Sequence, residues 1–261
     1  MKFYAAGLLA FITDAPLYSF IHDHALGSYF GERDNLNRAL EYYPHIFLDS
    51  GAFSAWTEKV TIKIEEYSKF LCRYSEKLDV YANLDVIGDP VGTLKNQNIL
   101  EKDGLNPLPV FHNGEDMKYL DDYVGSYDYV ALGGMVGSKT NDKWLDIIFS
   151  KYPDHKFHGF GLTDIALIRK YPFYSVDSTS WFSSQKFGTI MFPNGKTSHY
   201  DELNSNQLEY IKKSGFDIKM MKIKYQTRNA FNLLVTKRMI NSIEYNKINK
   251  LEYNNITEEF K

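Results

Sequence analysis

Cysteine is nearly absent from this chain of 261 residues, in which Cys72 is the only one. A single thiol forms no disulfide within the chain, and free thiols are typical of reducing compartments, so we expect a cytoplasmic location. The shortage also excludes a zinc site built from several cysteines, and we predict neither a metal nor a cofactor. Cys72 lies in a helical pattern over residues 64–77, and we expect it to pack there.

A long hydrophobic run is missing as well. The N-terminal segment, residues 1–11, is apolar, but Asp14 and Pro16 follow it at once. A transmembrane helix needs about 20 apolar residues in succession, so we predict no membrane partner. We interpret this segment as a core strand and not as a signal peptide, because a signal peptide begins with a more strongly positive region than this chain has.

The chain carries no strong charge of one sign, because its net charge is −3. The charges are unevenly spread, however, and residues 205–250 hold ten Lys or Arg against three acidic residues. Such a basic segment suits a face that contacts phosphates, although a solvated helix face has the same composition. The candidate nucleic-acid contacts are Lys212, Lys213, Lys222, Lys224, Arg228, Lys237 and Arg238.

Aromatic residues are abundant, at 16% of the chain. An AT-rich genome favours their codons, and stacking on bases, at about 1–3 kcal/mol per contact, also uses such side chains. Composition alone does not choose between these explanations. Phe53, Trp56 and Trp181 are candidates for stacking or for filling the gap left by an extruded base, and core packing is an equal alternative for each.

Short apolar runs alternate with helical patterns along most of the chain. The predicted strands are 3–9, 46–49, 80–85, 108–111, 129–132, 156–160 and 173–176, and the predicted helices are 62–77, 91–103, 115–124, 142–151 and 164–169. Strands that alternate with helices in this way are typical of βα units with a parallel sheet. We therefore predict an α/β fold, a (β/α)8 TIM-type barrel with its eighth strand after Asp177, and a doubly wound sheet as the alternative.

The C-terminal third follows a different pattern. Asn194-Gly195 lies between apolar and polar flanks, which predicts a hairpin turn. From Leu203 to Ile240 the pattern turns helical and predicts a C-terminal helical extension, whose basic part covers residues 203–250. No linker composition interrupts the chain, so residues 1–261 are expected to form a single domain.

Three aspartates stand at the ends of predicted strands. Asp49 and Asp177 each follow an apolar run, and Asp85 ends another. Catalytic groups of parallel barrels gather at the carboxyl ends of the strands, so we expect these carboxylates to face a common site. Each could instead cap a helix, and a pair of aspartates would also suit a glycosidase.

Polar residues and glycines end the other strands. His112 offers acid/base chemistry, and the amide of Asn113 both donates and accepts hydrogen bonds. The pair Gly133 and Gly134 permits close approach of backbone N–H groups to a flat ligand. Gly159 could admit a stacked ring, or it could serve only the turn from strand to helix.

Taken in chain order, these strand ends resemble the tRNA-guanine transglycosylase superfamily, the queuine tRNA-ribosyltransferase type. The resemblance covers about half of the chain, residues 46–179. The segments that carry it are Asp49-Ser50-Gly51-Ala52-Phe53, Asn83-Leu84-Asp85, Pro109-Val110-Phe111-His112-Asn113-Gly114, Ala131-Leu132-Gly133-Gly134-Met135-Val136-Gly137, Gly159-Phe160-Gly161 and Asp177.

The resemblance implies a (β/α)8 barrel with glycosyltransferase (pentosyltransferase) activity, which exchanges guanine for a 7-deazaguanine base. It implies Asp177 as the nucleophile of a covalent glycosyl intermediate and Asp49 as the general acid/base. Asp85 would then hold the Watson–Crick edge of the base. The further base contacts implied are Ser50, Phe53, His112, Asn113, Gly133, Gly134 and Gly159.

The chain also departs from the tRNA enzymes. They carry a zinc subdomain after the nucleophile, whereas this chain has residues 180–196 there and a single cysteine elsewhere. His112-Asn113 stands in place of a glutamine of the family. The chain is therefore most similar to the zinc-free transglycosylases of phages and bacteria, which insert a 7-deazaguanine into DNA and protect it from restriction.

This similarity implies DNA and a 7-deazaguanine base as partners, in the host cytoplasm if a phage encodes the chain. Two alternatives stay open at this point: the same chemistry could act on tRNA, or the chain could be a non-catalytic subunit that binds a nucleobase or nucleic acid. In each case the chain could act as a homodimer or with a partner protein.

Overall fold

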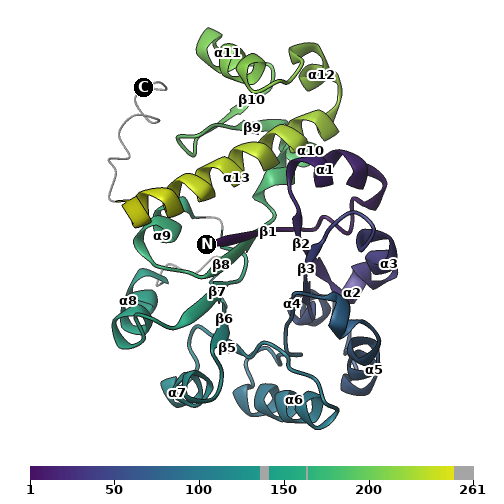
Figure 1. The fold of residues 1–261 in the computed structure, drawn as a ribbon, viewed down its shortest axis with the longest axis vertical. Helices are drawn as coiled ribbons and strands as arrows, with labels where there is room; N and C mark the ends of the chain where they lie inside the picture. The colour runs from purple at the N-terminus through teal and green to yellow at the C-terminus, as the bar shows by residue number, and fades with distance from the viewer. Residues whose placement is uncertain (136–140, 163, 250–261) are drawn as a thin grey trace.

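The computed structural model describes residues 1–135, 141–162 and 164–249. Its main sheet has eight strands, all parallel, in the order β4-β3-β2-β1-β8-β7-β6-β5 (Figure 1). The strands are β1 (Lys2–Ala6), β2 (His24–Ser28), β3 (His45–Asp49), β4 (Val80–Tyr81), β5 (Val110–His112), β6 (Tyr129–Gly133), β7 (Lys156–Gly159) and β8 (Ser175–Ser178).

Helices follow the strands along the chain and surround the sheet in Figure 1. They are α1 (Ala15–Ile21), α2 (Tyr29–Glu32), α3 (Leu36–Ala39), α4 (Ala52–Thr57), α5 (Ile64–Tyr74), α6 (Pro90–Lys102), α7 (Met117–Ser126), α8 (Asn141–Lys151) and α9 (Ile165–Lys170). The predicted α/β class with a parallel sheet is thereby confirmed. Cys72, which we expected to pack within its helix, is instead exposed.

The eighth strand is β2, and the prediction of a strand after Asp177 was wrong, because Asp177 itself lies in β8. β2 gives little signal in the sequence, since it is short and contains Gly27, a residue that strands disfavour. The glycine is nevertheless needed at this position. A Cβ atom there would lie 2.2 Å from Cδ2 of Leu9.

Two apolar cores flank the curled sheet. The inner face carries one cluster, and the outer face packs against the helices through a larger one. The two-residue period of a strand sends alternate side chains to these two sides. An isolated parallel bridge between Ala82 and Leu108 links the chain just after β4 with the chain just before β5, the two edge strands.

After β8 the chain forms a smaller C-terminal lobe with its own apolar cluster. The lobe comprises α10 (Ser183–Phe187), the antiparallel pair β9 (Thr189–Met191) and β10 (Thr197–His199), α11 (Ser205–Lys213), α12 (Ile218–Ile223) and α13 (Tyr225–Asn249). The hairpin predicted at Asn194-Gly195 is present as β9–β10. α13 runs between the sheet and this hairpin (Figure 1) and contacts α1 and β1. No helix in the described part of the chain is long and apolar enough to span a bilayer.

Trp181 joins the lobe to the sheet. Its side chain is fully buried, and its indole N–H donates a 3.0 Å hydrogen bond to the carbonyl of Ala6 in β1. Its ring meets those of Phe11 and Tyr18 edge-on, at centroid distances of 5.5 and 5.1 Å. Of its two predicted roles, core packing therefore holds and stacking on bases does not.

We expect Trp181→Ala to lower the free energy of unfolding by about 3–5 kcal/mol, because it opens a large cavity at this junction. Urea denaturation of the full chain measures the change. Trp56→Ala is the matched control, since that side chain is 59% exposed and its removal should change stability by less than about 0.5 kcal/mol. Equal losses in the two variants would contradict this role of Trp181.

Candidate active site

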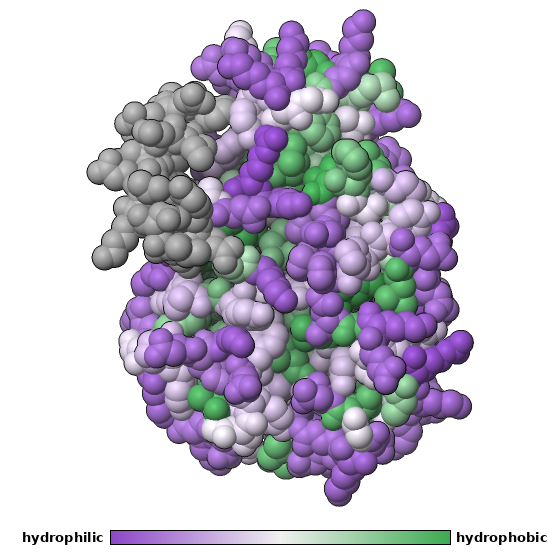
Figure 2. All heavy atoms as spheres, in the orientation of Figure 1, coloured by the Kyte–Doolittle hydropathy of each residue, from purple (hydrophilic) through white to green (hydrophobic). Residues whose placement is uncertain are grey.

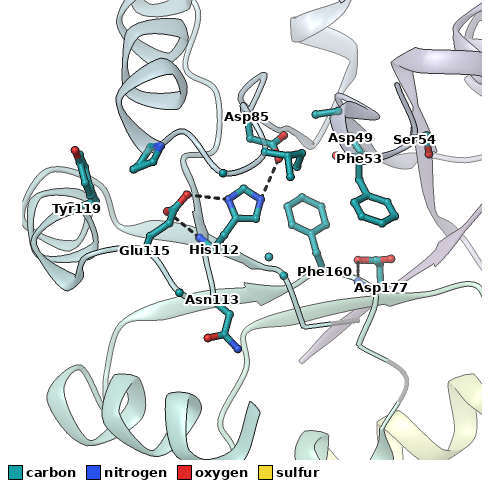
Figure 3. Close-up of a pocket in the computed structure, with 18 of the residues that line it drawn as sticks. Asp49, Phe53, Ser54, Asp85, His112, Asn113, Glu115, Tyr119, Phe160 and Asp177 are labelled. Atoms are coloured by element: carbon teal, nitrogen blue, oxygen red, sulfur yellow. Dashed lines mark hydrogen bonds and ion pairs between the residues drawn. The ribbon is translucent and has the colours of Figure 1, made fainter. Parts of the chain in front are cut away.

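A cavity of about 700 Å³ lies at the carboxyl ends of the sheet strands, where Asp49, Asp85 and Asp177 line it together. They come from the ends of β3 and β8 and from the segment after β4. Figure 3 shows Asp85 and its partners on one side of the cavity, Asp177 on another, and the ring of Phe160 between them. The structure thus brings together three carboxylates that are far apart in the sequence, as the strand-end argument predicts.

Strand alternation sets which side chains reach this cavity. In β3, Phe47 belongs to the inner core and Asp49, two residues later, lines the cavity. In β5, Val110 belongs to the same core and His112 lines the cavity. In each strand, an apolar side chain packs in the inner core, and the polar side chain two residues later lies on the same face, at the end that opens into the cavity.

Asp177 is held by donors. Its side chain is 7% exposed, and its Oδ1 accepts from the backbone N–H of Gly161 at 2.8 Å and lies 3.2 Å from Nε2 of His158. His158 is fully buried, with its Nδ1 2.6 Å from the hydroxyl of Ser175, and that hydroxyl is 2.5 Å from the Tyr129 hydroxyl. A neutral ring protonated at Nε2 satisfies this chain, because Nδ1 then accepts from Ser175 and Nε2–H donates to Asp177. Both N–H groups stabilise a negative charge on Asp177.

Asp49 has the opposite surroundings. Burial, and after it the negative charges of Asp85 and Asp177, raise the pKa of Asp49 to about 7. Hydrogen bonds from the backbone N–H groups of Gly51 and Ser50 oppose that rise without cancelling it. A carboxyl group with this pKa holds a proton for part of the time at neutral pH, which is what a general acid/base requires.

Asp85 belongs to a bonded group with His112 and Glu115. One carboxylate oxygen of Asp85 accepts from the Ser50 hydroxyl at 3.1 Å, and the other lies 3.0 Å from Nε2 of His112. The second ring nitrogen of His112 lies 3.2 Å from Glu115, whose other oxygen accepts from the His112 backbone N–H at 3.0 Å. Burial alone would lower the pKa of His112, but the two carboxylates outweigh it and raise the pKa to about 9. His112 is therefore a cation at neutral pH.

Gly133 and Gly134 have a packing reason that the sequence does not reveal. A Cβ atom at Gly133 would lie 2.6 Å from Cδ2 of His112, so the glycine makes room for that ring. Gly134 has a φ of +73°, a left-handed conformation that favours glycine. Both residues line the cavity, and Val136 and Gly137 of the same segment lie outside the described residues.

The other predicted base contacts divide into two groups. Phe53 and Asn113 line the cavity, and Phe53 is 63% exposed at its rim. Ser50 does not line it but supports Asp85 from behind, as described above. Gly159 turns the other way, because a Cβ atom there would meet Leu162 and Phe173 in the layer between sheet and helices. This position gives no support to the prediction that a ligand ring stacks over Gly159.

The sequence did not indicate three residues of the site: Glu115 and Phe160, which line the cavity, and His158, which is buried behind Asp177. Glu115 reads as the start of a helical pattern, and only the three-residue spacing from His112 hints at their contact. His158 lies inside an apolar strand, where a histidine is more often structural. Phe160 lies between Gly159 and Gly161, and its side chain lines the cavity only because the sheet curls.

The predicted nucleic-acid contacts have diverse surroundings. Lys212, Lys213, Lys222 and Lys224 are exposed on α11 and around α12. Arg228 is a correction: it is 8% exposed, donates to the Ser184 hydroxyl and the Met221 carbonyl, and stacks on the Tyr200 ring at 4.4 Å. The Lys237 ammonium donates to the carbonyl of Ile21, and Arg238 donates to the Ser214 hydroxyl. Arg228 therefore serves the core of the C-terminal lobe.

Comparison with known proteins adds no relative, since no protein-family model and no curated protein matches the chain. We therefore infer the function from the cavity itself. The cavity combines one carboxylate held by N–H donors, one carboxyl group with a raised pKa, and a half-buried group of a cation between two carboxylates. Such a set suits nucleophilic displacement with proton transfer at a ring nitrogen or oxygen.

We expect His112 to titrate near pH 9 in NMR spectra of the labelled protein, and Glu115→Gln to lower that pKa because it removes one of the two flanking charges. Since the folded pKa exceeds the ordinary 6.5, His112 contributes stability that is complete below about pH 6.5 and is lost as the pH rises through 9. The gap in unfolding free energy between the natural chain and His112→Asn, on the order of 2 kcal/mol, should shrink across this window. A His112 ring that titrates near pH 6.5 would contradict the assignment.

Proposed function

We propose that this chain is a base-exchange transglycosylase, which replaces guanine in DNA by a 7-deazaguanine base through a covalent aspartyl-glycosyl intermediate. The observation that carries the proposal is the contrast between two aspartates in one cavity. Asp177 is held by two N–H donors, whereas the pKa of Asp49 is raised to about 7. Opposite environments for two carboxyl groups are the usual basis for dividing nucleophile from acid/base.

In the first half-reaction, the Asp177 carboxylate attacks the anomeric carbon of the target nucleotide. The glycosidic bond breaks, its electron pair leaves with the guanine, and protonated Asp49 supplies the proton that the leaving base needs. In the second half-reaction, Asp49 removes the proton from the ring nitrogen of the incoming 7-deazaguanine. That nitrogen attacks the same carbon, and the ester bond to Asp177 breaks and restores the carboxylate.

The side of the cavity opposite Asp177 would recognise the base. Asp85 accepts from donors on the Watson–Crick edge of guanine, and its orientation is fixed by Ser50 and His112. The Phe160 ring, which contacts those of Phe47 and His158, offers a flat surface for the base to stack on. Gly133 and Gly134 keep the neighbouring wall free of side chains.

The target nucleotide must leave the base stack before Asp177 can reach its sugar, at a cost of a few kcal/mol. Phe53 lines the cavity, and the ring of Trp56 lies 6.0 Å from the Phe53 ring. Both side chains are well placed to fill the gap, because they are 63% and 59% exposed. Figure 2 shows hydrophilic side chains over α11 and α12 at the top of the view. The exposed lysines of these helices would contact the phosphate backbone.

The proposal takes the curled sheet as a closed (β/α)8 barrel with the C-terminal helices as an extension. The Ala82–Leu108 bridge between the edge strands supports closure. If a phage encodes the chain, base exchange in the host cytoplasm would protect its DNA from restriction. The same chemistry on tRNA is the alternative that the experiment below separates.

We expect a covalent adduct between this protein and guanine-containing DNA, detected by intact-mass measurement after denaturation, and no adduct in Asp177→Ala. Asp49→Asn should slow base exchange by about 10²–10⁴-fold, because it removes the acid/base. The assay is run in parallel on single-stranded DNA, duplex DNA and tRNA, with and without a 7-deazaguanine base.

Asp164→Asn is the matched control, because Asp164 caps α9 outside the cavity and asparagine caps helices equally well. It should form the adduct like the natural chain. An adduct with tRNA alone would show that the substrate is RNA and not DNA. A folded protein that forms no adduct with any of these nucleic acids, or Asp177→Ala that still forms one, would overturn the proposal.

A further inference from the structure

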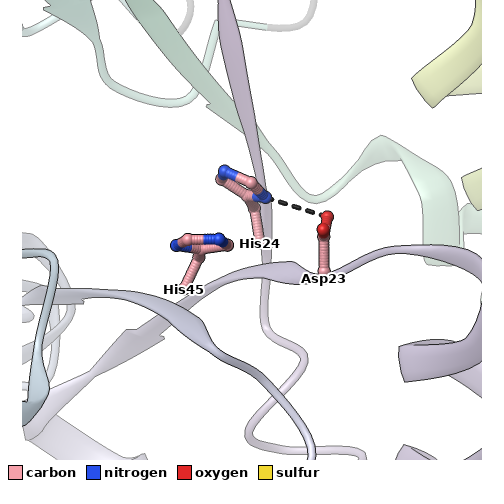
Figure 4. A group of neighbouring side chains, drawn as sticks. All are labelled: Asp23, His24 and His45. Carbon is pink, nitrogen blue, oxygen red and sulfur yellow. Dashed lines mark hydrogen bonds and ion pairs between the residues drawn. The ribbon is translucent and has the colours of Figure 1, made fainter.

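A cluster of histidines and aspartates lies at the amino ends of the strands, opposite the cavity. His22 and Asp23 connect α1 to β2, His24 and His45 are the first residues of β2 and β3, and Asp79 directly precedes β4. Figure 4 shows the side chains of Asp23, His24 and His45 gathered at one place. None of these residues takes part in the proposed base exchange.

Three side chains of this cluster have donor atoms close enough to share one ion. Asp23, His24 and His45 each offer an atom that lies within 4.8 Å of the others. Oδ1 of Asp23 is 2.9 Å from Nδ1 of His24, and His24 is the direct neighbour of His45 in the register of β2 and β3. Two ligand atoms on a tetrahedral ion lie roughly 3.4 Å apart, given bonds of about 2.0–2.1 Å, so the side chains must rotate to bring their ligand atoms to this spacing.

The histidine tautomers are also set for metal binding. Nδ1 of His45 lies 2.8 Å from a carboxylate oxygen of Asp79, so a ring that donates there leaves its Nε2 as a free ligand atom. Nε2 of His22 donates to the carbonyl of Phe3 at 2.8 Å, which leaves Nδ1 without its proton in the neutral ring. Metal-binding histidines characteristically donate their other N–H to a carboxylate or a backbone carbonyl in this way.

His22 supplies an independent observation. Its side chain is 5% exposed, and within the described residues its Nδ1 is buried without a hydrogen-bond partner. That atom lies 4.0 Å from Oδ1 of Asp23, on the side of the cluster. A buried nitrogen with no partner costs free energy, and an ion shared with Asp23 would satisfy it.

We propose that Asp23, His24 and His45 bind a divalent transition-metal ion of the zinc type, with Nδ1 of His22 as the fourth ligand. Imidazole and carboxylate donors suit zinc, whereas calcium and magnesium prefer sets made of oxygen alone. The rings of His24 and His45 are stacked 4.3 Å apart at 29°, and binding requires their planes to open. The exposed edge of His45, whose side chain is 41% exposed, gives room for that rotation.

The position of the cluster indicates a structural role for the ion. It would tie the α1–β2 turn to β3 and, through Asp79, to β4. In parallel barrels the amino ends of the strands serve stability, whereas chemistry is carried out at the carboxyl ends. The ion would therefore be dispensable for base exchange but would raise the stability of the folded chain.

The test uses the full chain without an affinity tag, because tags made of histidine bind metals themselves. The protein is incubated with Zn²⁺, dialysed against metal-free buffer and analysed for bound metal and melting temperature, with Co²⁺ as a spectroscopic probe. We expect one zinc per chain and a higher melting temperature with zinc than without it. Bound Co²⁺ should show the intense visible absorption of a tetrahedral site.

His24→Gln and His45→Gln should abolish zinc retention, and Asp79→Asn should weaken binding by about 10–100-fold because it removes the carboxylate that orients His45. His199→Gln is the matched control, since His199 also lies near an aspartate, 3.8 Å from Asp201, in the C-terminal lobe. It should retain zinc. Circular dichroism of the metal-free variants checks that each is folded. A natural chain that retains no zinc, or folded His24 and His45 variants that retain it fully, would overturn the proposal.

Discussion

The two-residue alternation of the parallel strands is the constraint on which the rest of the structure depends. It sends Phe47 to the inner core and Asp49 to the cavity, and the same spacing places Ser175 beneath Asp177. A shift of one residue in any strand would exchange the inner face for the helix-packed face. The carboxylates would then be buried against apolar side chains, and neither the cavity nor the core would form.

The polar groups at the carboxyl ends divide into two electrostatic settings. On one side, the series that runs from half-buried Tyr129 through buried Ser175 to buried His158 ends in a donor to Asp177. On the other side, the positive charge of His112 lies between two carboxylates and fixes Asp85 in place. Among the residues that the structure describes, backbone N–H groups but no cation act on Asp49, and burial together with its charged neighbours raises its pKa to about 7. The proposed division of roles follows from this difference in partners.

The sequence predicted what depends on local pattern. Short apolar runs identified seven of the eight sheet strands, and the polar residues that end them identified Asp49, Asp85 and Asp177 as neighbours. It did not predict β2, because Gly27 weakens the pattern while serving a contact with Leu9. Nor did it predict Glu115 and His158 as parts of the site, because their partners are fixed only when the sheet curls. Arg228 shows the same limit, since charge alone suggested a surface role for a side chain that is buried.

The central claim is that Asp49 carries a proton near neutral pH while it lies in the same cavity as the nucleophile. The most direct measurement is an NMR titration of the aspartate carboxyl carbons in the natural chain and in Asp49→Asn. The account predicts one carboxyl group that titrates near pH 7 and disappears in the variant. Titration of Asp49 entirely below pH 5 would contradict it, because the residue would then be an ordinary ionised carboxylate with no proton to give.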